Sequence, residues 1–394
     1  MNARDAIAAY ATRFHRAVGA EHHVASPLGA WIVLALAAPA ADDDRLRAEL
    51  ADVLGLPIEE AAKTARLLLE SPPDVLALAA AAWRRVSTDA LDAWLATLPD
   101  EVGTGPLPSQ EQADAWAREH TLDLIEAFPL DLSDPLLLVV LCSAIACQIS
   151  WAHPFEPVGV DQLQIACAPG FDVATLLHAP SKTGDHRTNI VMTDDGVMAA
   201  HAAWSTDHDM AVVSVIADPS LAPDVVIRNA HDIAMELART RNFAGRVSLF
   251  DLPLETGHSW SIAEHTEVRS KERERIDTIL PAWSAKSEYG LLSLDIGFDA
   301  AGEALCHAAG GEEWSAKHVA VAEYTRAGFK AAAITVLAMR ASAAPRHQTV
   351  RVREARVEFT HPHAVVAVSV VDDDAAPWAS MPLFSAWVTQ ADEA

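Results

Sequence analysis

The spacing of apolar residues predicts helices in the first third of the chain. Over residues 5–18, apolar or alanine side chains recur every three or four positions, which places them on one face of a helix. Ser26 and Pro27 form an N-cap and a first helical position, and the apolar run 28–41 indicates a buried helix after them. Two further helices are predicted at 44–54, ended by Gly55 and Pro57, and at 110–128.

The remainder of the chain contains more patterns that are typical of strands. The nearly continuous apolar run 136–149 suits a strand that is buried on both faces. Helices followed mainly by strands, without a repeat or a long linker, predict an α+β fold with an antiparallel or mixed sheet and a single domain over residues 1–394. Runs of β-branched residues predict strands at 210–216, 246–250, 319–322, 349–352, 365–371 and 383–388.

Composition narrows the range of partners and locations. The net charge of −26 opposes binding to nucleic acid or to an anionic membrane. The run 28–41 resembles the core of a signal peptide, but it begins too far from Met1 and is too short to span a membrane. A cytoplasmic location is therefore expected. Four cysteines without Cys-x-x-Cys spacing predict free thiols: Cys142, Cys147, Cys167 and Cys306.

The motifs of common enzymes are incomplete in this sequence. The segment GHSWS at 257–261 comes close to a nucleophile elbow but has no final glycine. The triplet DHD at 207–209 offers acid–base groups, but the spacing places no nucleophile beside it. The histidine pairs at 22–23 and 361/363 are more typical of turns than of zinc sites. We therefore expect no enzymatic activity, no cofactor and no bound metal.

Four groups of motifs, in order along the chain, point to one family. The first is Ser26-Pro27-Leu28 with Leu54-Gly55-Leu56, and the second is Asp114-x-Trp116, Thr121 and Ile125, followed by Leu141-x-Ser143-Ala144-Ile145, Trp151 and Pro154-Phe155. The third is Leu280-Pro281-x-Trp283 with Ser287-Glu288-Tyr289, and the fourth is His318 and Glu323, then GFKAAAIT at 328–335, His361-Pro362 and Leu383-Phe384. Together they resemble the serpin family, and the chain is identified as a divergent, bacterial-like member.

This resemblance implies a fold and a mechanism. The expected fold is a single large domain with a main mixed β-sheet, two smaller sheets, about eight or nine helices and an exposed reactive-centre loop at about 326–350. The expected function is inhibition of a chymotrypsin-like or subtilisin-like serine protease by a suicide substrate, which is cleaved, held as an acyl-enzyme and inserted into the sheet as a strand. The implied protein is a monomer, and its location could also be extracellular.

The resemblance also assigns the loop residues. The family's usual spacing from the hinge glycine puts the reactive bond at Ser342–Ala343, with Arg340 and Met339 as competing bait and a later arginine (Arg346, Arg351, Arg353 or Arg356) as an alternative. The hinge residues are Arg326, Gly328, Phe329, Lys330, Ala331, Ala332, Ala333, Ile334 and Thr335. Because side chains alternate along a strand, Phe329, Ala331, Ala333 and Thr335 share a face, which by resemblance points into the core.

Several positions depart from the family pattern. The implied sheet-opening region comprises Ser26, Gly29, Ser143 and Trp151, but the family usually has serine at position 29 and asparagine at position 143. At the hinge, Arg326 replaces an acidic residue, Phe329 a threonine or serine, and Lys330 a glutamate. A large Phe329 contributes if it has room and stalls insertion if it has none. The alternative function is therefore a non-inhibitory serpin-fold binding or storage protein.

Overall fold

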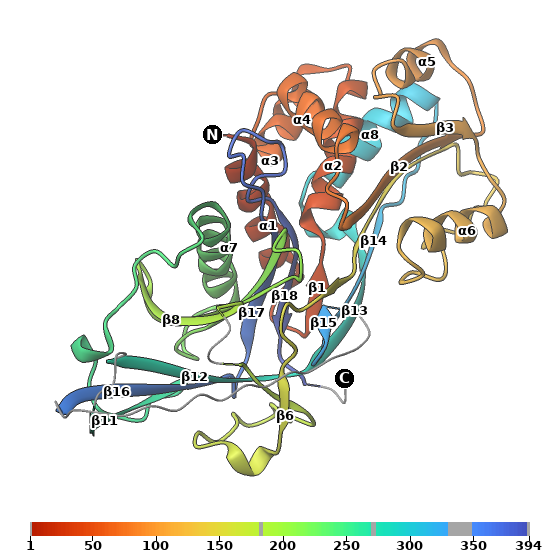
Figure 1. Cartoon of the computed structure of the whole chain (residues 1–394). Helices are drawn as coiled ribbons and strands as arrows, with labels where there is room; N and C mark the ends of the chain where they lie inside the picture. The colour runs from red at the N-terminus through yellow and green to blue at the C-terminus, as the bar shows by residue number, and fades with distance from the viewer. Residues whose placement is uncertain (1, 181–183, 269–272, 330–348, 392–394) are drawn as a thin grey trace. The chain divides into compact units, whose positions relative to one another are not determined.

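The computed structural model describes residues 2–180, 184–268, 273–329 and 349–391. Their contacts divide the chain into two compact units, each built from three separate segments. Unit 1 comprises Met1–Gln148, Ala285–Ala322 and Ala367–Ala386, and unit 2 comprises Ile149–Ser284, Glu323–Val366 and Trp387–Ala394. Figure 1 shows the helices and strands coloured by their position along the chain.

Helices and strands are both well represented, as expected for an α+β protein. The α-helices within the described residues are α1 (Ala3–Val18), α2 (Pro27–Ala37), α3 (Asp44–Leu54), α4 (Ile58–Glu70), α5 (Asp89–Leu95), α6 (Gln110–His120), α7 (Pro223–Thr240) and α8 (Phe298–Ala309). The strands are β1 (His23–Ala25), β2 (Leu76–Arg84), β3 (Val102–Pro106), β4 (Val139–Cys147), β5 (Ile149–Ser150), β6 (Glu156–Val158), β7 (Leu176–His178), β8 (His186–Thr193), β9 (Gly196–Trp204), β10 (Met210–Ile216), β11 (Trp260–Val268), β12 (Glu274–Pro281), β13 (Trp283–Gly290), β14 (Lys317–Tyr324), β15 (Gly328–Phe329), β16 (Thr349–Glu358), β17 (His363–Ser369) and β18 (Pro382–Val388).

The N-terminal helices of unit 1 form where the sequence predicts them. Ser26 caps α2, because its Oγ accepts a hydrogen bond from the backbone N–H of Gly29 at 3.3 Å. The apolar run after it is the buried helix that was predicted, and the indole of Trp31 donates to the carbonyl of Leu54 at 3.1 Å. Helix α3 ends at Gly55, whose left-handed φ of 69° suits a residue without a side chain.

Helix α6 packs on the mixed sheet β3-β2-β4 of unit 1. Strand β2 pairs parallel with β3 and antiparallel with β4. The Trp116 ring of α6 contacts the rings of Trp83 and Phe128, with centroids 5.4 and 6.4 Å apart. The helix ends eight residues before the predicted end at Phe128, because Leu122 and Asp123 have positive φ angles, which an α-helix does not allow.

Strand β4 corrects the expectation of burial on both faces. Most of its side chains, including that of Ser143, are only half-buried. The strand pairs antiparallel with β2, and antiparallel sheets tolerate a face that is partly open to solvent. Its apolar composition therefore reflects packing on one face, together with the contacts made by α6.

Unit 2 contains an antiparallel meander and a five-stranded sheet. In the meander, β9 lies between β8 and β10, and α7 packs against β10. The second sheet has the order β11-β16-β12-β7-β6, in which β16 pairs antiparallel with β11 and parallel with β12. The strand predicted at 246–250 is wrong: Arg246 makes one isolated bridge, and Leu249–Asp251 form a short 3-10 helix that Ser248 caps.

The cysteines are free thiols, as predicted. Burial raises the pKa of the Cys142 and Cys147 thiols to about 12, which removes their reactivity as nucleophiles. Among the described residues, no helix has both the length and the apolar character needed to cross a membrane.

Candidate functional site at the hinge

Two hinge residues already form a strand. Phe329 of β15 pairs antiparallel with Tyr324 of β14. On the other edge of β15, Gly328 pairs with Ser150 and Phe329 with Ile149, both in β5. Strand β15 therefore has a neighbour on each side immediately before residue 330, within unit 2.

The turn before β15 is held mainly through backbone groups. Its carbonyl oxygens at Arg326 and Ala327 accept hydrogen bonds from the backbone N–H groups of Phe155 (2.9 Å) and Trp151 (3.0 Å). The Trp151 indole donates to the carbonyl of Thr325 at 2.9 Å, and the Arg326 guanidinium donates to the carbonyl of Phe155 at 3.3 Å. Arg326 thus makes two hydrogen bonds with Phe155, one through its backbone carbonyl and one through its guanidinium. Neither bond needs the acidic side chain that the family usually has at this position.

An aromatic cluster packs beneath the turn. The fully buried Tyr324 ring stacks on Trp283, with centroids 6.1 Å apart and planes 13° apart, and it also contacts Trp151 (5.1 Å) and Phe155 (5.6 Å). Phe329 is 5% exposed, and its ring meets Trp283 edge-on at 6.5 Å. The structure therefore has room for this large hinge residue, and its burial contributes about 1.5–3 kcal/mol.

Two buried histidines extend this packing. The His186 ring meets Phe155 edge-on at 4.4 Å and bonds the carbonyl of His153 at 2.6 Å. His201 lies 3.4 Å from His186 through ring nitrogens and 2.8 Å from the hydroxyl of Thr188. Burial lowers the pKa of His186 to about 4 and that of His201 well below its usual value, so both rings are neutral at pH 7. No local sequence signal identifies this pair, because its members lie in different strands.

Three of the predicted sheet-opening residues meet in unit 1. Ser26 Oγ accepts from the N–H of Gly29 and donates to the carbonyl of Leu383 at 2.9 Å. Ser143 Oγ donates to the carbonyl of Gly29 at 3.0 Å. The backbone N–H of Ser26 donates to His318 Nε2 at 3.1 Å. The fourth predicted residue, Trp151, lies in unit 2, where it contacts the hinge turn.

Unit 1 also has two strand edges that lack a paired neighbour in the part of the chain that the structure describes. Strand β4 lies at the edge of the sheet β3-β2-β4, and β15 pairs with β14 only at Tyr324. The edge of a sheet presents N–H and C=O groups that can pair with a further strand.

The residues assigned to the reactive bond lie outside the described residues. This applies to Ser342, Ala343, Arg340, Met339 and Arg346, and to the hinge residues Lys330, Ala331, Ala332, Ala333, Ile334 and Thr335.

The later arginines are different, because the structure describes three of them. All three lie in β16, where Arg353 and Arg356 are paired on both edges, with β11 and β12, whereas Arg351 is paired with β11 alone. Arg353, only 13% exposed, donates to Glu264 at 2.9 Å. A strand that is paired on both edges has no free backbone to offer a protease, which argues against bait at Arg353 and Arg356. Bait at Arg346 or Arg351 stays a prediction.

Comparisons with known proteins agree on the fold. No family model matches the sequence, and no curated protein sequence matches it. The solved structures similar to it include the thermophilic serpin tengpin in its native state (TM-score 0.64, 13% identity, covering 98% of this chain and 93% of that chain). Serpin48 of the insect Tenebrio molitor has a TM-score of 0.60 at 13% identity, covering 99% of this chain and 98% of that chain. Human thyroxine-binding globulin complexed with thyroxine has a TM-score of 0.59 at 13% identity, covering 98% of this chain and 96% of that chain.

These similarities extend over nearly the full length of both chains and agree with the α+β composition and the helix and strand order described above. The sequence motifs that resemble serpins thus occur in a chain whose fold is similar to that of solved serpins. The chain is a serpin-fold protein.

Proposed function

We propose that this protein inhibits serine proteases of the chymotrypsin or subtilisin type by acting as a suicide substrate. The observation that supports the proposal is the hinge strand β15, which is paired on both edges and immediately precedes residues 330–348. Because β15 is already paired, the residues that follow it can lengthen the strand one at a time, and no new strand has to be started.

The chemistry is supplied by the protease. Its serine attacks a carbonyl carbon within residues 330–348, the peptide C–N bond breaks, and an ester links the protease to the new carboxyl end of this chain. The residues after Phe329 then continue β15 as a strand, and each ladder hydrogen bond that forms contributes about 0.5–1.5 kcal/mol. The attached protease is displaced with the loop before water hydrolyses the ester.

Strand geometry decides which loop side chains become buried. Side chains of a strand alternate between its faces, so Ala331 and Ala333 follow the face of Phe329, which is buried against Trp283. Ala332 follows the opposite face. Small residues at 331 and 333 allow the neighbouring strands to close around the new one.

The cleaved bond is proposed to be Ser342–Ala343. Arg340 would direct cleavage by a protease with an acidic specificity pocket, and Met339 by one with an apolar pocket. Identification of the new N-terminus after cleavage distinguishes the three positions.

A second candidate function is a binding protein that does not trap proteases. The observation that favours it is the departure of three hinge residues, Arg326, Phe329 and Lys330, from the residues that the family usually has there. A non-protease ligand is known for a protein of similar fold, since thyroxine-binding globulin has been solved with thyroxine.

The test is the formation of a covalent complex. The protein is mixed with trypsin, chymotrypsin or subtilisin and run on a denaturing gel, where we expect a complex that survives boiling. A protease whose catalytic serine is replaced by alanine is the control, because it cannot form the ester. Cleavage within 330–348 that leaves the protease active and yields no complex would favour the second candidate.

Two loop variants test the insertion step. Ala331→Arg puts a charge on the buried face, which costs several kcal/mol without a partner, so we expect cleavage without trapping. Ala332→Arg is the matched control, because its side chain faces the other way, and it should trap as well as the parent protein. Equal trapping by both variants would contradict insertion in the register of β15.

A further inference from the structure

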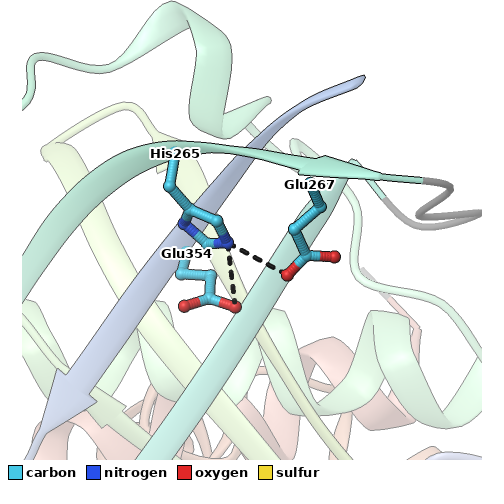
Figure 2. Close-up of side chains that lie close together, drawn as sticks. All are labelled: His265, Glu267 and Glu354. Carbon is cyan, nitrogen blue, oxygen red and sulfur yellow. Dashed lines mark hydrogen bonds and ion pairs between the residues drawn. The ribbon is translucent and has the colours of Figure 1, made fainter. Parts of the chain in front are cut away.

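One face of the five-stranded sheet in unit 2 brings together three side chains of the kind that bind metal ions. They are His265 and Glu267 of β11 and Glu354 of β16, as Figure 2 shows. His265 Nε2 lies 3.0 Å from Glu267 Oε1 and 4.0 Å from Glu354 Oε1. All three ligand atoms lie within 4.8 Å of one another, and the side chains are between 30% and 45% exposed, so an ion can reach them.

Strand register explains why these residues meet. Ala263 of β11 lies opposite Glu354 in the antiparallel pair with β16. Because side chains alternate, His265 and Glu267 share the face of Ala263 and extend along the same line of the sheet. Arg275 of β12 lies directly opposite Glu354 on the other side of β16.

The guanidinium of Arg275 lies between the two carboxylates. Its Nη1 donates to Glu267 Oε1 at 2.6 Å and to Glu354 Oε1 at 2.9 Å, and its Nη2 donates to Glu267 Oε2 at 2.6 Å. Two carboxylate groups therefore share one guanidinium, which is the group that a metal ion would have to replace.

We propose that His265, Glu267 and Glu354 form a binding site for a divalent transition-metal ion of the Zn²⁺ class, in competition with Arg275. Zinc binds imidazole nitrogen and carboxylate oxygen at about 2.0–2.2 Å, which in a tetrahedral site places ligand atoms about 3.3–3.5 Å apart. The separations of 3.0 and 4.0 Å bracket this value, so the three ligands need only small side-chain rotations once the Arg275 guanidinium has been displaced. Water would complete the coordination, as in other zinc sites with three protein ligands.

The ligand set selects the class of ion. Mg²⁺ and Ca²⁺ prefer oxygen ligands throughout, whereas imidazole suits zinc and its neighbours in the first transition row. Arg275 Nη1 occupies the space between the two oxygens, so zinc must displace it, and removal of this guanidinium should strengthen zinc binding. Bound metal would also join β11 to β16, the strand that follows residues 330–348.

The experiment is a zinc titration by calorimetry on tag-free protein that has been treated with a chelator. A background with Cys167→Ser and Cys306→Ser removes two partly exposed thiols, and burial raises the pKa of the other two, Cys142 and Cys147, to about 12. We expect one zinc ion per chain, at least tenfold weaker binding in His265→Ala and in Glu354→Gln, and at least tenfold tighter binding in Arg275→Met. Mg²⁺ and Ca²⁺ should show no saturable binding at the same concentrations.

His178→Ala is the matched control, because His178 also contacts a carboxylate of this sheet, at Asp277, but does not belong to the three-ligand group. It should leave zinc affinity unchanged, and thermal melts of the metal-free variants confirm that each is folded. Unchanged affinity in His265→Ala, or no gain in Arg275→Met, would overturn the proposal. Loss of zinc binding in His178→Ala alone would do the same.

Discussion

Truncation of Phe329 tests whether the hinge strand is held by its aromatic side chain. Phe329 is 5% exposed and meets the edge of Trp283 at 6.5 Å. In Phe329→Ala, the lost burial costs about 1.5–3 kcal/mol, and the lost ring pair about 0.5–1.5 kcal/mol more. A sum of about 2–4.5 kcal/mol increases local opening of the hinge about 30- to 1600-fold, since each 1.4 kcal/mol is a factor of ten.

Hydrogen exchange measures this opening directly. The amides of Trp151 and Phe155 bond to the carbonyls of Ala327 and Arg326, so they exchange when the hinge turn leaves its place. In Phe329→Ala we expect a peptide that covers residues 149–155 to exchange at least tenfold faster. Exchange in α1, which belongs to unit 1, should stay unchanged.

Phe359→Ala provides the control for general destabilisation. Phe359 is 1% exposed and packs against His363 in the same unit. Its truncation should lower the free energy of unfolding without a selective loss of protection at 149–155. If Phe329→Ala leaves that protection unchanged, or if both variants reduce it equally, Phe329 does not anchor the hinge.

Three further predictions concern the stability of the fold. Burial lowers the pKa of His186 to about 4, and that of three other buried histidines also falls below the usual 6.5, so the unfolded state binds more protons below pH 6.5. The stability that these histidines contribute is complete above pH 6.5 and falls towards pH 4 by about 1.4 kcal/mol per pH unit for each histidine. In urea unfolding at several pH values, the free energy of unfolding should therefore change less steeply with pH in His186→Gln. An added Cβ at Gly245, which has a φ of +65°, would lie 2.6 Å from a backbone oxygen, whereas Gly170 has a φ of +82° and open space around it. In urea unfolding, Gly170→Ala should lower the free energy of unfolding by about 1–2 kcal/mol, and Gly245→Ala by about 1–3 kcal/mol more. Equal losses in the two variants would contradict the clash at Gly245. Gly29 lies in the first turn of α2, and an added Cβ would have its nearest contacts at 3.4 Å; Gly29→Ala should therefore raise the free energy of unfolding by about 0.5–1 kcal/mol, and a loss of stability would show that the cluster with Ser143 has no room.

Local patterns predicted the elements whose signals are contained within a few neighbouring residues. The N-cap at Ser26 and the left-handed stop at Gly55 set the bounds of α2 and α3, because each depends on bonds within one turn of helix. The motifs around Trp116, Trp283 and Gly328 resemble the serpin family and predicted the fold that the solved structures share with this chain. The error at the end of α6 arose because the apolar residues after His120 continue a helical spacing while the backbone turns away from it.

The hinge and the proposed metal site depend on pairings that no local pattern contains. The sequence marks Gly328 and Phe329 as hinge residues, but only the folded chain brings Trp151 to the carbonyl of Thr325, 174 residues away. The burial of Phe329 could not be predicted, because it depends on how Trp283 and β5 pack around this residue in the folded chain.

The amino-acid sequence by itself determines the helical N-terminus, the acidic charge, the free thiols and the resemblance that identifies the hinge. Tertiary structure alone decides that two hinge residues are already paired, that Phe329 is buried, and that β16 lies between β11 and β12 with His265, Glu267 and Glu354 on one face. The physical reason is that helices and caps form through bonds between near neighbours, whereas strand order and register are set by backbone bonds and side-chain packing between segments far apart in the chain.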